Sequence, residues 1–262
     1  MAEAKESPSV AVERALAILE AVASRADGLT NAEISRKLHI PKSSASYILR
    51  TLENSGYLRR DSEARYRVGV KVLSLSRSAL SGLDVRDLAM PLMRDLVDQT
   101  RLTCHLAILD GSSAVYIEKV DAPGFIKVDT WVGRRMLVHT TGVGKALAAY
   151  LPQARVQKIL DAAGMEKRTP HSITTPVKYF KELEHVREQG YALDNEENSV
   201  GARCFAAPIF NQSNEIEASL GLSGTTQQVN PETLPQLSEQ LREVANRISR
   251  QLGWRGPKKK PV

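Results

Sequence analysis

The sequence has only two cysteines, Cys104 and Cys204, among its 262 residues. Two thiols are too few for a structural zinc site, and their wide separation gives no sign of a disulfide framework. A chain of this length can bury two separate cores without such support. The scarcity of cysteine is also typical of a reducing compartment, so we expect two domains in a cytoplasmic protein.

Long apolar runs are also missing. No stretch approaches the roughly 18 to 20 apolar residues that a membrane-spanning helix needs. The N terminus has no charged-then-apolar signal pattern, and the chain shows no internal repeat. We therefore expect no membrane partner and no solenoid or fibrous architecture.

The sequence lacks an assembled catalytic or nucleotide-binding motif. Ser223 lies in Gly221–Gly224, which is not a G-x-S-x-G nucleophile turn. Cys104 and His105 are neighbours on a predicted strand, so their side chains point to opposite faces. A P-loop requires glycine at position 139 and Ser or Thr at 146, where this chain has histidine and alanine. We expect neither an enzyme nor a bound cofactor or metal.

Positive charge is concentrated in one segment. The chain carries a formal net charge of +6, and residues 36–67 contain eight Lys and Arg against three acidic residues. Such a concentration favours a polyanionic partner. A second basic run, Lys258–Lys260, belongs to a tail over 254–262 that we expect to be disordered, with nonspecific phosphate contact as the alternative.

The N-terminal pattern predicts a winged helix-turn-helix over 9–69, after a disordered segment 1–8. Apolar spacing indicates a helix near 9–24, and Thr30 with Glu33 has the spacing of a capping box that starts a second helix. A third helix runs from Pro41 to Gly56. Two short strands near 57–60 and 66–68 form the wing, and a linker helix follows over 70–83.

The third helix is the expected DNA reader. Ser43, Ser44 and Tyr47 lie on its outward face, where its N-terminal part would meet base edges. Arg50 on the same face contacts either guanine or phosphate. The expected phosphate contacts, which position the domain without reading sequence, are Arg36, Lys42, Arg65 and Arg67. The alternative is a winged module that serves protein assembly, and the basic concentration argues against it.

Residues 84–253 alternate between helical and strand patterns and predict a separate α+β domain. Its expected elements are a helix near 85–99, strands near 103–109, 114–120, 125–130 and 136–139, helices within 142–161, a helix near 176–189, strands near 204–210 and 215–223, and a final helix. We expect an acidic loop after the helix near 176–189, and Asn230-Pro231 as the cap of the final helix. Gly142–Gly144 form a strand-to-helix turn that either exposes N–H groups to an anion or simply packs closely.

Several segments resemble the IclR family of bacterial transcription regulators. They are Tyr66–Gly69 before the linker, Thr141–Leu147, Gly190-Tyr191 with Asp194–Glu197, Gly201–Phe210 and Ala218–Gly224. Their order and spacing cover nearly the whole chain and are more specific than any one motif. Thr225 departs from the family, which often has proline there.

This resemblance implies a GAF-like sensor with an antiparallel sheet flanked by helices, and a pocket for a small-molecule effector. The pocket residues that it implies are Phe125, Val128, Met136, Gly142, Val143, Asp194, Ala202, Cys204 and Ser223. Without the resemblance, Phe125, Val128 and Met136 would be interpreted as core residues and Cys204 as a small buried hydrophobe. Asp194 would be a solubilising loop residue or a cap. The family further implies an organic acid, sugar acid or aromatic catabolite as effector.

The size of the reader implies an oligomer. One small winged module binds DNA modestly, so we expect a homodimer or homotetramer on near-palindromic operator DNA. The sequence leaves open whether the protein is a repressor, an activator or both.

Overall fold

The computed structural model describes residues 9–80, 84–124 and 127–256, without the side chains of 76–80 and 84. The chain divides into two compact units, residues 1–82 and 83–262. Phe125, the segment 1–8 and Lys258–Lys260 lie outside the described residues. No helix in the described part of the chain is long and apolar enough to cross a membrane.

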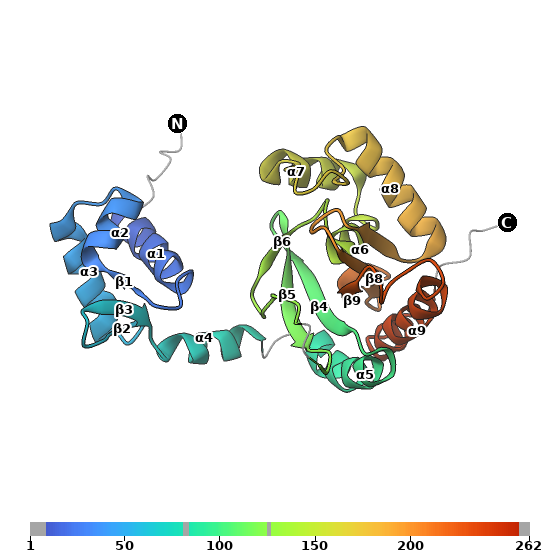
Figure 1. Cartoon of the computed structure of the whole chain (residues 1–262), viewed down its shortest axis with the longest axis horizontal. Helices are drawn as coiled ribbons and strands as arrows, with labels where there is room; N and C mark the ends of the chain where they lie inside the picture. Colours follow the sequence, from blue (N-terminus) through green and yellow to red (C-terminus); the bar gives the residue numbers. More distant parts are fainter. Residues whose placement is uncertain (1–8, 81–83, 125–126, 257–262) are drawn as a thin grey trace, which may run out of the picture. The chain divides into compact units, whose positions relative to one another are not determined.

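The first unit is a winged helix-turn-helix (Figure 1). Its elements are α1 (Val10–Ala23), β1 (Leu29–Thr30), α2 (Asn31–Leu38), α3 (Lys42–Asn54), β2 (Leu58–Arg60), β3 (Arg65–Val68) and α4 (Lys71–Leu80). Apolar side chains from all three leading helices meet in one core, which includes Ile18, Ile34 and Leu49. The sequence did not predict β1, which adds to the wing in the sheet order β1-β3-β2.

The turn between α2 and α3 is fixed by local chemistry. Thr30 Oγ1 accepts from the Glu33 N–H at 3.3 Å while the Thr30 N–H donates to Glu33 Oε2 at 2.7 Å, which confirms the capping box. His39 ends α2 in the left-handed conformation with φ of 52°, and Pro41 precedes α3. These two residues redirect the chain so that α3 presents one face outward.

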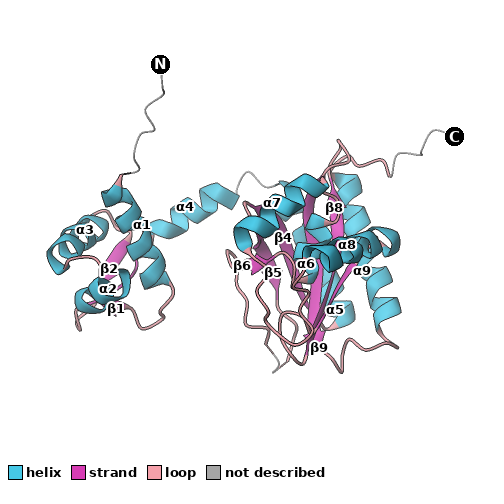
Figure 2. Ribbon diagram, turned by 90° about the horizontal axis from the view of Figure 1, so that it is seen from above, coloured by secondary structure: helices cyan, strands magenta, loops and turns pink. Residues whose placement is uncertain are grey.

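The second unit is an α+β domain with one six-stranded antiparallel sheet in the order β6-β5-β4-β9-β8-β7. Its strands are β4 (Thr103–Asp110), β5 (Ser113–Val120), β6 (Arg135–Leu137), β7 (Ala192–Asn195), β8 (Ala202–Phe210) and β9 (Ile216–Thr225). Its helices are α5 (Asp84–Thr100), α6 (Gly142–Ala148), α7 (Gln153–Ala163), α8 (Pro176–Gln189) and α9 (Leu234–Gln251). Helices α5 and α9 pack together beside the sheet, while α6, α7 and α8 lie on its other side (Figures 1 and 2).

Three predicted features of this unit are wrong. The described residues 127–130 form no strand, because the Lys119 ammonium, rather than a neighbouring strand, binds the carbonyls of Val128 and Thr130 at 3.0 and 2.8 Å. The expected acidic loop begins instead as β7, which pairs with residues 203–206 of β8. Asn230 caps a turn rather than the final helix, which starts at Leu234.

The packed part of the chain also extends beyond the expected boundary at residue 253. The Trp254 indole stacks on Phe210 with centroids 5.2 Å apart, and its Nε1–H donates to Asn214 Oδ1 at 2.7 Å. Both contacts hold the end of the described chain against the hairpin of β8 and β9.

A fully buried lysine joins α6 to two other segments. Lys145 Nζ donates to Glu182 Oε1 on α8 at 2.8 Å and to Glu197 Oε1 at 2.7 Å, and it also donates to the carbonyl of Leu193. Burial leaves this ammonium no water, so these acceptors replace its hydration. These two ion pairs therefore tie α6 to α8 and to the segment that leaves β7.

We expect Lys145→Met to destabilise this unit by about 3–5 kcal/mol, because it leaves the carboxylate of Glu197 buried without its counterion. Both tryptophans lie in the second unit, so urea unfolding followed by tryptophan fluorescence reports on it alone. Lys158→Met, at an exposed position on α7, is the matched control and should change stability by less than about 0.5 kcal/mol. Equal effects of the two substitutions would contradict the assigned role of Lys145.

Candidate functional site: a DNA-reading face and an effector cavity

The outward face of α3 carries the predicted DNA readers. Lys42, Ser43, Tyr47 and Arg50 are exposed, and Ser44 is half-buried. The Tyr47 side chain is 74% exposed, which is unusual for a large aromatic residue. Since Ser43, Tyr47 and Arg50 are spaced by four and three residues, they form one stripe along the helix.

Two of the predicted phosphate contacts are bound within the protein. Arg67 Nε donates to Asp61 Oδ2 at 3.0 Å, and its Nη1 donates to the carbonyl of Ala26. Arg65 Nη1 reaches the carbonyl of Gly28 at 3.1 Å and Glu33 Oε2 at 3.4 Å. These contacts join β3 to α2 and to the residues before β1, so both arginines hold the wing in place.

Three further basic residues of this unit are exposed. Arg36 is exposed on α2, and Arg59 and Arg60 are exposed on β2. The Arg60 guanidinium lies 5.7 Å from the centre of the Tyr66 ring. Arg59 and Arg60 belong to the basic segment of the sequence but were not among the predicted DNA contacts. Strand alternation alone could not have identified them, because it does not show which arginines of the wing are bound within the protein.

Asp61 organises the turn of the wing. Its Oδ1 accepts from the N–H groups of Glu63 and Arg65, and these hydrogen bonds together with the Arg67 guanidinium lower the pKa of its carboxyl. The Thr30 backbone and hydroxyl similarly lower the pKa of Glu33. Both carboxylates are therefore charged at neutral pH, which keeps the arginine contacts intact.

The second unit contains a cavity of about 650 Å³, here called the effector cavity. Its walls are β4, β8 and β9 of the sheet, the start of α6, the segment between β5 and β6, and the segment before β8. The effector-pocket residues found in its lining are Val128, Met136, Gly142, Val143, Asp194, Ala202, Cys204 and Ser223. The structure thus brings together eight of the nine residues implied by the family resemblance.

Close backbone packing sets the position of α6 beside this cavity. A Cβ on Gly144 would approach the Val138 carbonyl oxygen to 2.6 Å, and a Cβ on Gly221 would approach the Val143 side chain to 2.7 Å. The Thr141 hydroxyl caps the helix by accepting from the Gly144 N–H at 3.2 Å. The tight-packing interpretation of the glycine-rich turn is therefore right for Gly144, while Gly142 and Val143 line the cavity.

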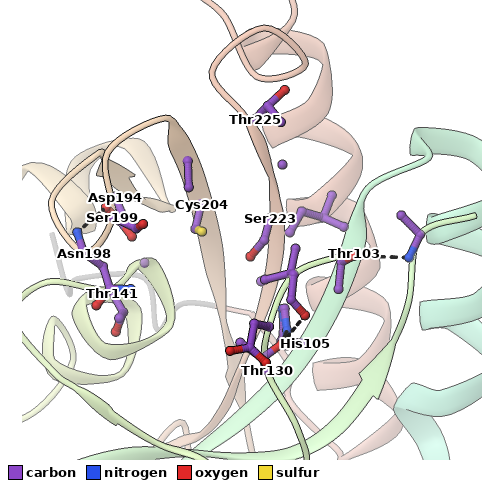
Figure 3. A pocket seen from close by; sticks show the side chains of 18 of the residues that line it. Thr103, His105, Thr130, Thr141, Asp194, Asn198, Ser199, Cys204, Ser223 and Thr225 are labelled. Atoms are coloured by element: carbon purple, nitrogen blue, oxygen red, sulfur yellow. Dashed lines mark hydrogen bonds between the residues drawn. The ribbon is translucent and has the colours of Figure 1, made fainter. Parts of the chain in front are cut away.

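One wall of the cavity carries polar side chains that sequence reasoning did not assign. Thr103 and His105 lie at alternate positions of β4, opposite Ser223 and Gly221 of β9 (Figure 3). Figure 3 shows Asp194, Asn198 and Thr141 together at another part of the wall. Polar residues at alternate positions of an otherwise apolar strand are the signal that would have identified Thr103 and His105.

His105 is neutral and incompletely hydrogen-bonded. Burial, followed by the positive charge of Lys119, lowers the pKa of His105 to about 3. Its Nε2 lies 2.7 Å from Thr130 Oγ1, and its ring stacks on Tyr116. Nδ1 is buried and has no hydrogen-bond partner among the described residues. A buried polar atom of this kind is suited to a ligand.

Asp194 is both a loop cap and a cavity residue. Its Oδ1 accepts from the Glu197 N–H at 2.7 Å and the Asn198 N–H at 3.2 Å. Burial raises the pKa of Asp194 to about 7, although these two N–H groups act in the opposite direction. The negative charge of Glu197 raises it further, and Lys145 lowers it. Asp194 therefore changes charge near neutral pH.

The cavity lining contains more basic than acidic residues. The basic side chains are Arg101, Lys127, Arg134 and Arg168, and the acidic ones are Asp129 and Asp194. The Cys204 thiol, whose pKa burial raises to about 12, is uncharged at neutral pH. The lining therefore favours a small, negatively charged ligand.

Comparisons with known proteins agree with this geometry. Residues 77–250 match the family model for the bacterial transcriptional regulator IclR C-terminal region, and residues 11–62 match the IclR helix-turn-helix domain. The chain belongs to the IclR family of transcription regulators. It combines a DNA-binding helix-turn-helix with a C-terminal ligand-binding domain, and its relatives are named as transcription regulators.

Individual relatives cover almost the whole chain. The chain is 38% identical over 257 residues to the HTH-type transcriptional regulator RhmR of Escherichia coli (strain K12), covering 98% of each chain. It is 36% identical to XynR of the same strain, covering 93% of this chain and 97% of XynR. The crystal structure of the Thermotoga maritima IclR superposes with a TM-score of 0.77 at 31% identity, covering 93% of this chain and 98% of that one.

We expect Asp194→Asn to stabilise the second unit at pH 8 by up to about 4 kcal/mol. The pKa of Asp194 is higher in the folded than in the unfolded state, so the wild type loses stability as pH rises from about 4 to about 7. Asparagine retains the acceptor for both N–H groups but does not ionise. Urea unfolding followed by tryptophan fluorescence between pH 4 and pH 8 measures the difference.

Asp129→Asn serves as the control, because Asp129 lines the same cavity but is exposed. Its stability profile should remain parallel to that of the wild type. Parallel profiles for Asp194→Asn as well would show that the carboxyl of Asp194 does not titrate in this range.

Proposed function

We propose that this IclR-family regulator binds near-palindromic operator DNA as a homodimer or homotetramer, and that a small organic acid in the effector cavity modulates this binding. The observation that carries the proposal is the effector cavity itself, with its excess of basic side chains and the unpartnered Nδ1 of His105. Because its proposed target is operator DNA, we assign the protein to the cytoplasm. We assign no catalytic activity to it.

On the DNA side, α3 lies in the major groove and Ser43, Ser44 and Tyr47 contact base edges. Arg50 follows on the same stripe, and Arg36 and Lys42 contact phosphate. Arg65 and Arg67 also contact phosphate, while they keep the hydrogen bonds that hold the wing in place. The exposed Arg59 and Arg60 add phosphate contacts from β2.

On the effector side, the ligand carboxylate lies near the N–H groups of Gly142 and Val143 and the basic side chains of the lining. The first N–H groups of a helix have no carbonyl partner within the helix, which suits them to an anion. The neutral His105 binds a ligand hydroxyl. A tenfold effect on operator affinity requires about 1.4 kcal/mol of coupling between the two sites.

The competing function is protein assembly through the winged module. A salt series on duplex DNA distinguishes the two, because counterion release makes DNA binding steeply dependent on salt. Specific binding to the protein's own upstream DNA over random DNA supports the regulator. Binding that is independent of salt would favour the assembly module. Light scattering that showed only monomer would remove the oligomer from the proposal.

Arg50→Ala should weaken operator binding by about 1 to 3 kcal/mol with relaxed specificity at one base pair, if Arg50 reads a base. Mobility shifts with operator and random duplexes provide the measurement. Arg155→Ala, which removes an exposed charge from α7, should leave both affinities unchanged. Equal losses on both duplexes would assign Arg50 to a phosphate instead.

Ser223→Leu should abolish the response to an acid while operator binding remains, because Ser223 lines the cavity and the larger side chain would occupy space that the ligand needs. Gluconate, lactate and benzoate are the probes in the mobility-shift assay, and the acid that alters wild-type binding is then titrated against the variant. Ser213→Leu, in the exposed turn after β8, is the control and should respond normally. An unchanged response of Ser223→Leu would place the acid outside this cavity.

A further inference from the structure

A second cavity, of about 510 Å³, lies elsewhere in the C-terminal unit. Its walls come from Tyr150 just after α6, the end of α8, the last residues of β8, α9 and Trp254. It shares no lining residue with the effector cavity. Its volume falls within the range of ordinary small-molecule sites.

The space exists because β7 is much shorter than β8. Strand β7 pairs with residues 203–206 and no further, so the following residues Ala207–Phe210 have no strand partner on that edge within the described chain. Side chains from α8 and α9, rather than a strand, face this part of β8. They include Arg187 and Arg242.

The two arginines give the lining of this cavity a positive charge. Arg187 Nη1 donates to the neutral carbonyl of Ala149 at 2.7 Å, and Arg187 has no ion-pair partner among the described residues. Arg242 Nη1 lies 3.1 Å from Glu239, whose side chain is 59% exposed and lies outside the lining. Among the residues that the structure describes, no aspartate or glutamate belongs to the lining of this cavity.

A phenol lines the same cavity as both guanidinium groups, since Tyr150, Arg187 and Arg242 all belong to its lining. Burial raises the pKa of Tyr150, while the charges of Arg187 and Arg242 lower it. All three side chains carry hydrogen-bond donors that a ligand in this cavity can use. Guanidinium groups bind carboxylates in a planar, two-point geometry.

Two further aromatic rings, those of Phe210 and Trp254, line the cavity. Phe210 meets Tyr150 edge to face with centroids 4.9 Å apart, and Trp254 stacks on Phe210. The hydrogen bond from Trp254 to Asn214 fixes the indole in this position. Flat apolar walls beside paired cations match an anion with a flat apolar body.

We propose that this second cavity binds a planar organic anion of the aromatic carboxylate class. Its carboxylate lies among Arg187, Arg242 and Tyr150, and its ring lies beside Phe210 and Trp254. This site is distinct from the effector cavity and does not depend on the function proposed for it.

The chain's two tryptophans allow the two cavities to be read separately. Trp254 lines the second cavity, while Trp131 lies 4.6 Å under the guanidinium of Arg134, a residue of the effector cavity. In full-length Trp131→Phe protein, titration with benzoate should change Trp254 fluorescence in a saturable manner. Benzamide, which has the same shape without the charge, should bind at least tenfold more weakly.

Replacing both arginines in this background, Arg187→Gln with Arg242→Gln, should weaken benzoate binding at least tenfold. The matched control, Arg155→Gln with Arg247→Gln, removes two exposed arginines outside the cavity and should stay within twofold of the parent. Circular dichroism checks folding. If the double variant is unfolded, the single substitution Arg242→Gln should still weaken benzoate binding measurably. The ion-pair partner of Arg242 is the exposed Glu239, so the fold should tolerate this change.

Three results would overturn the proposal: no saturable signal from Trp254, equal affinity for benzoate and benzamide, or equal affinity after the arginine substitutions. A benzoate response seen only from Trp131, in Trp254→Phe protein, would place benzoate in the effector cavity alone. That result would leave the function proposed for the effector cavity intact.

Discussion

The second unit depends on the ion pairs of one buried ammonium group, that of Lys145. A lysine without access to water is tolerable only where acceptors surround it, and here they come from α8 and from the segment that leaves β7. This requirement fixes α6 against the sheet and also fixes Asp194–Asn198 beside it. The start of α6 and the segment Asp194–Asn198 both line the effector cavity, so the ion pairs of Lys145 help to set the shape of this cavity.

The DNA-binding domain uses its charges in two different ways. Arg65 and Arg67 bind carboxylates and carbonyls of their own domain and thereby hold the wing. Within the described residues, the exposed side chains of Lys42 and Arg50 on α3 and the arginines of β2 make no ion pair, although Arg60 lies over the Tyr66 ring. A basic segment in the sequence therefore contains both structural charges and charges that are available to DNA.

Much of this organisation follows from sequence patterns. The capping box at Thr30 and Glu33, the three leading helices and α8 are where periodicity and turn chemistry place them. Local rules are sufficient there, since each pattern is completed within a few residues. The patterns missed β1 and β7, which are short and become strands only through pairing. The partner of β1 is β3, far along the chain, and the partner of β7 is β8, the next strand.

The helix-turn-helix and the outward face of α3 follow from helical spacing, which is a local property of the sequence. The family follows from the order of several motifs, and that resemblance, rather than spacing, implied the eight residues that line the effector cavity. Tertiary structure alone decided which arginines are free, that Thr103 and His105 face the effector cavity, and that Arg187, Arg242 and Trp254 meet in a second one. Each of these depends on contacts between distant segments, and their burial sets the pKa of Asp194 and of His105. Spacing along a chain carries no information about such desolvation, since it arises only when other elements exclude water.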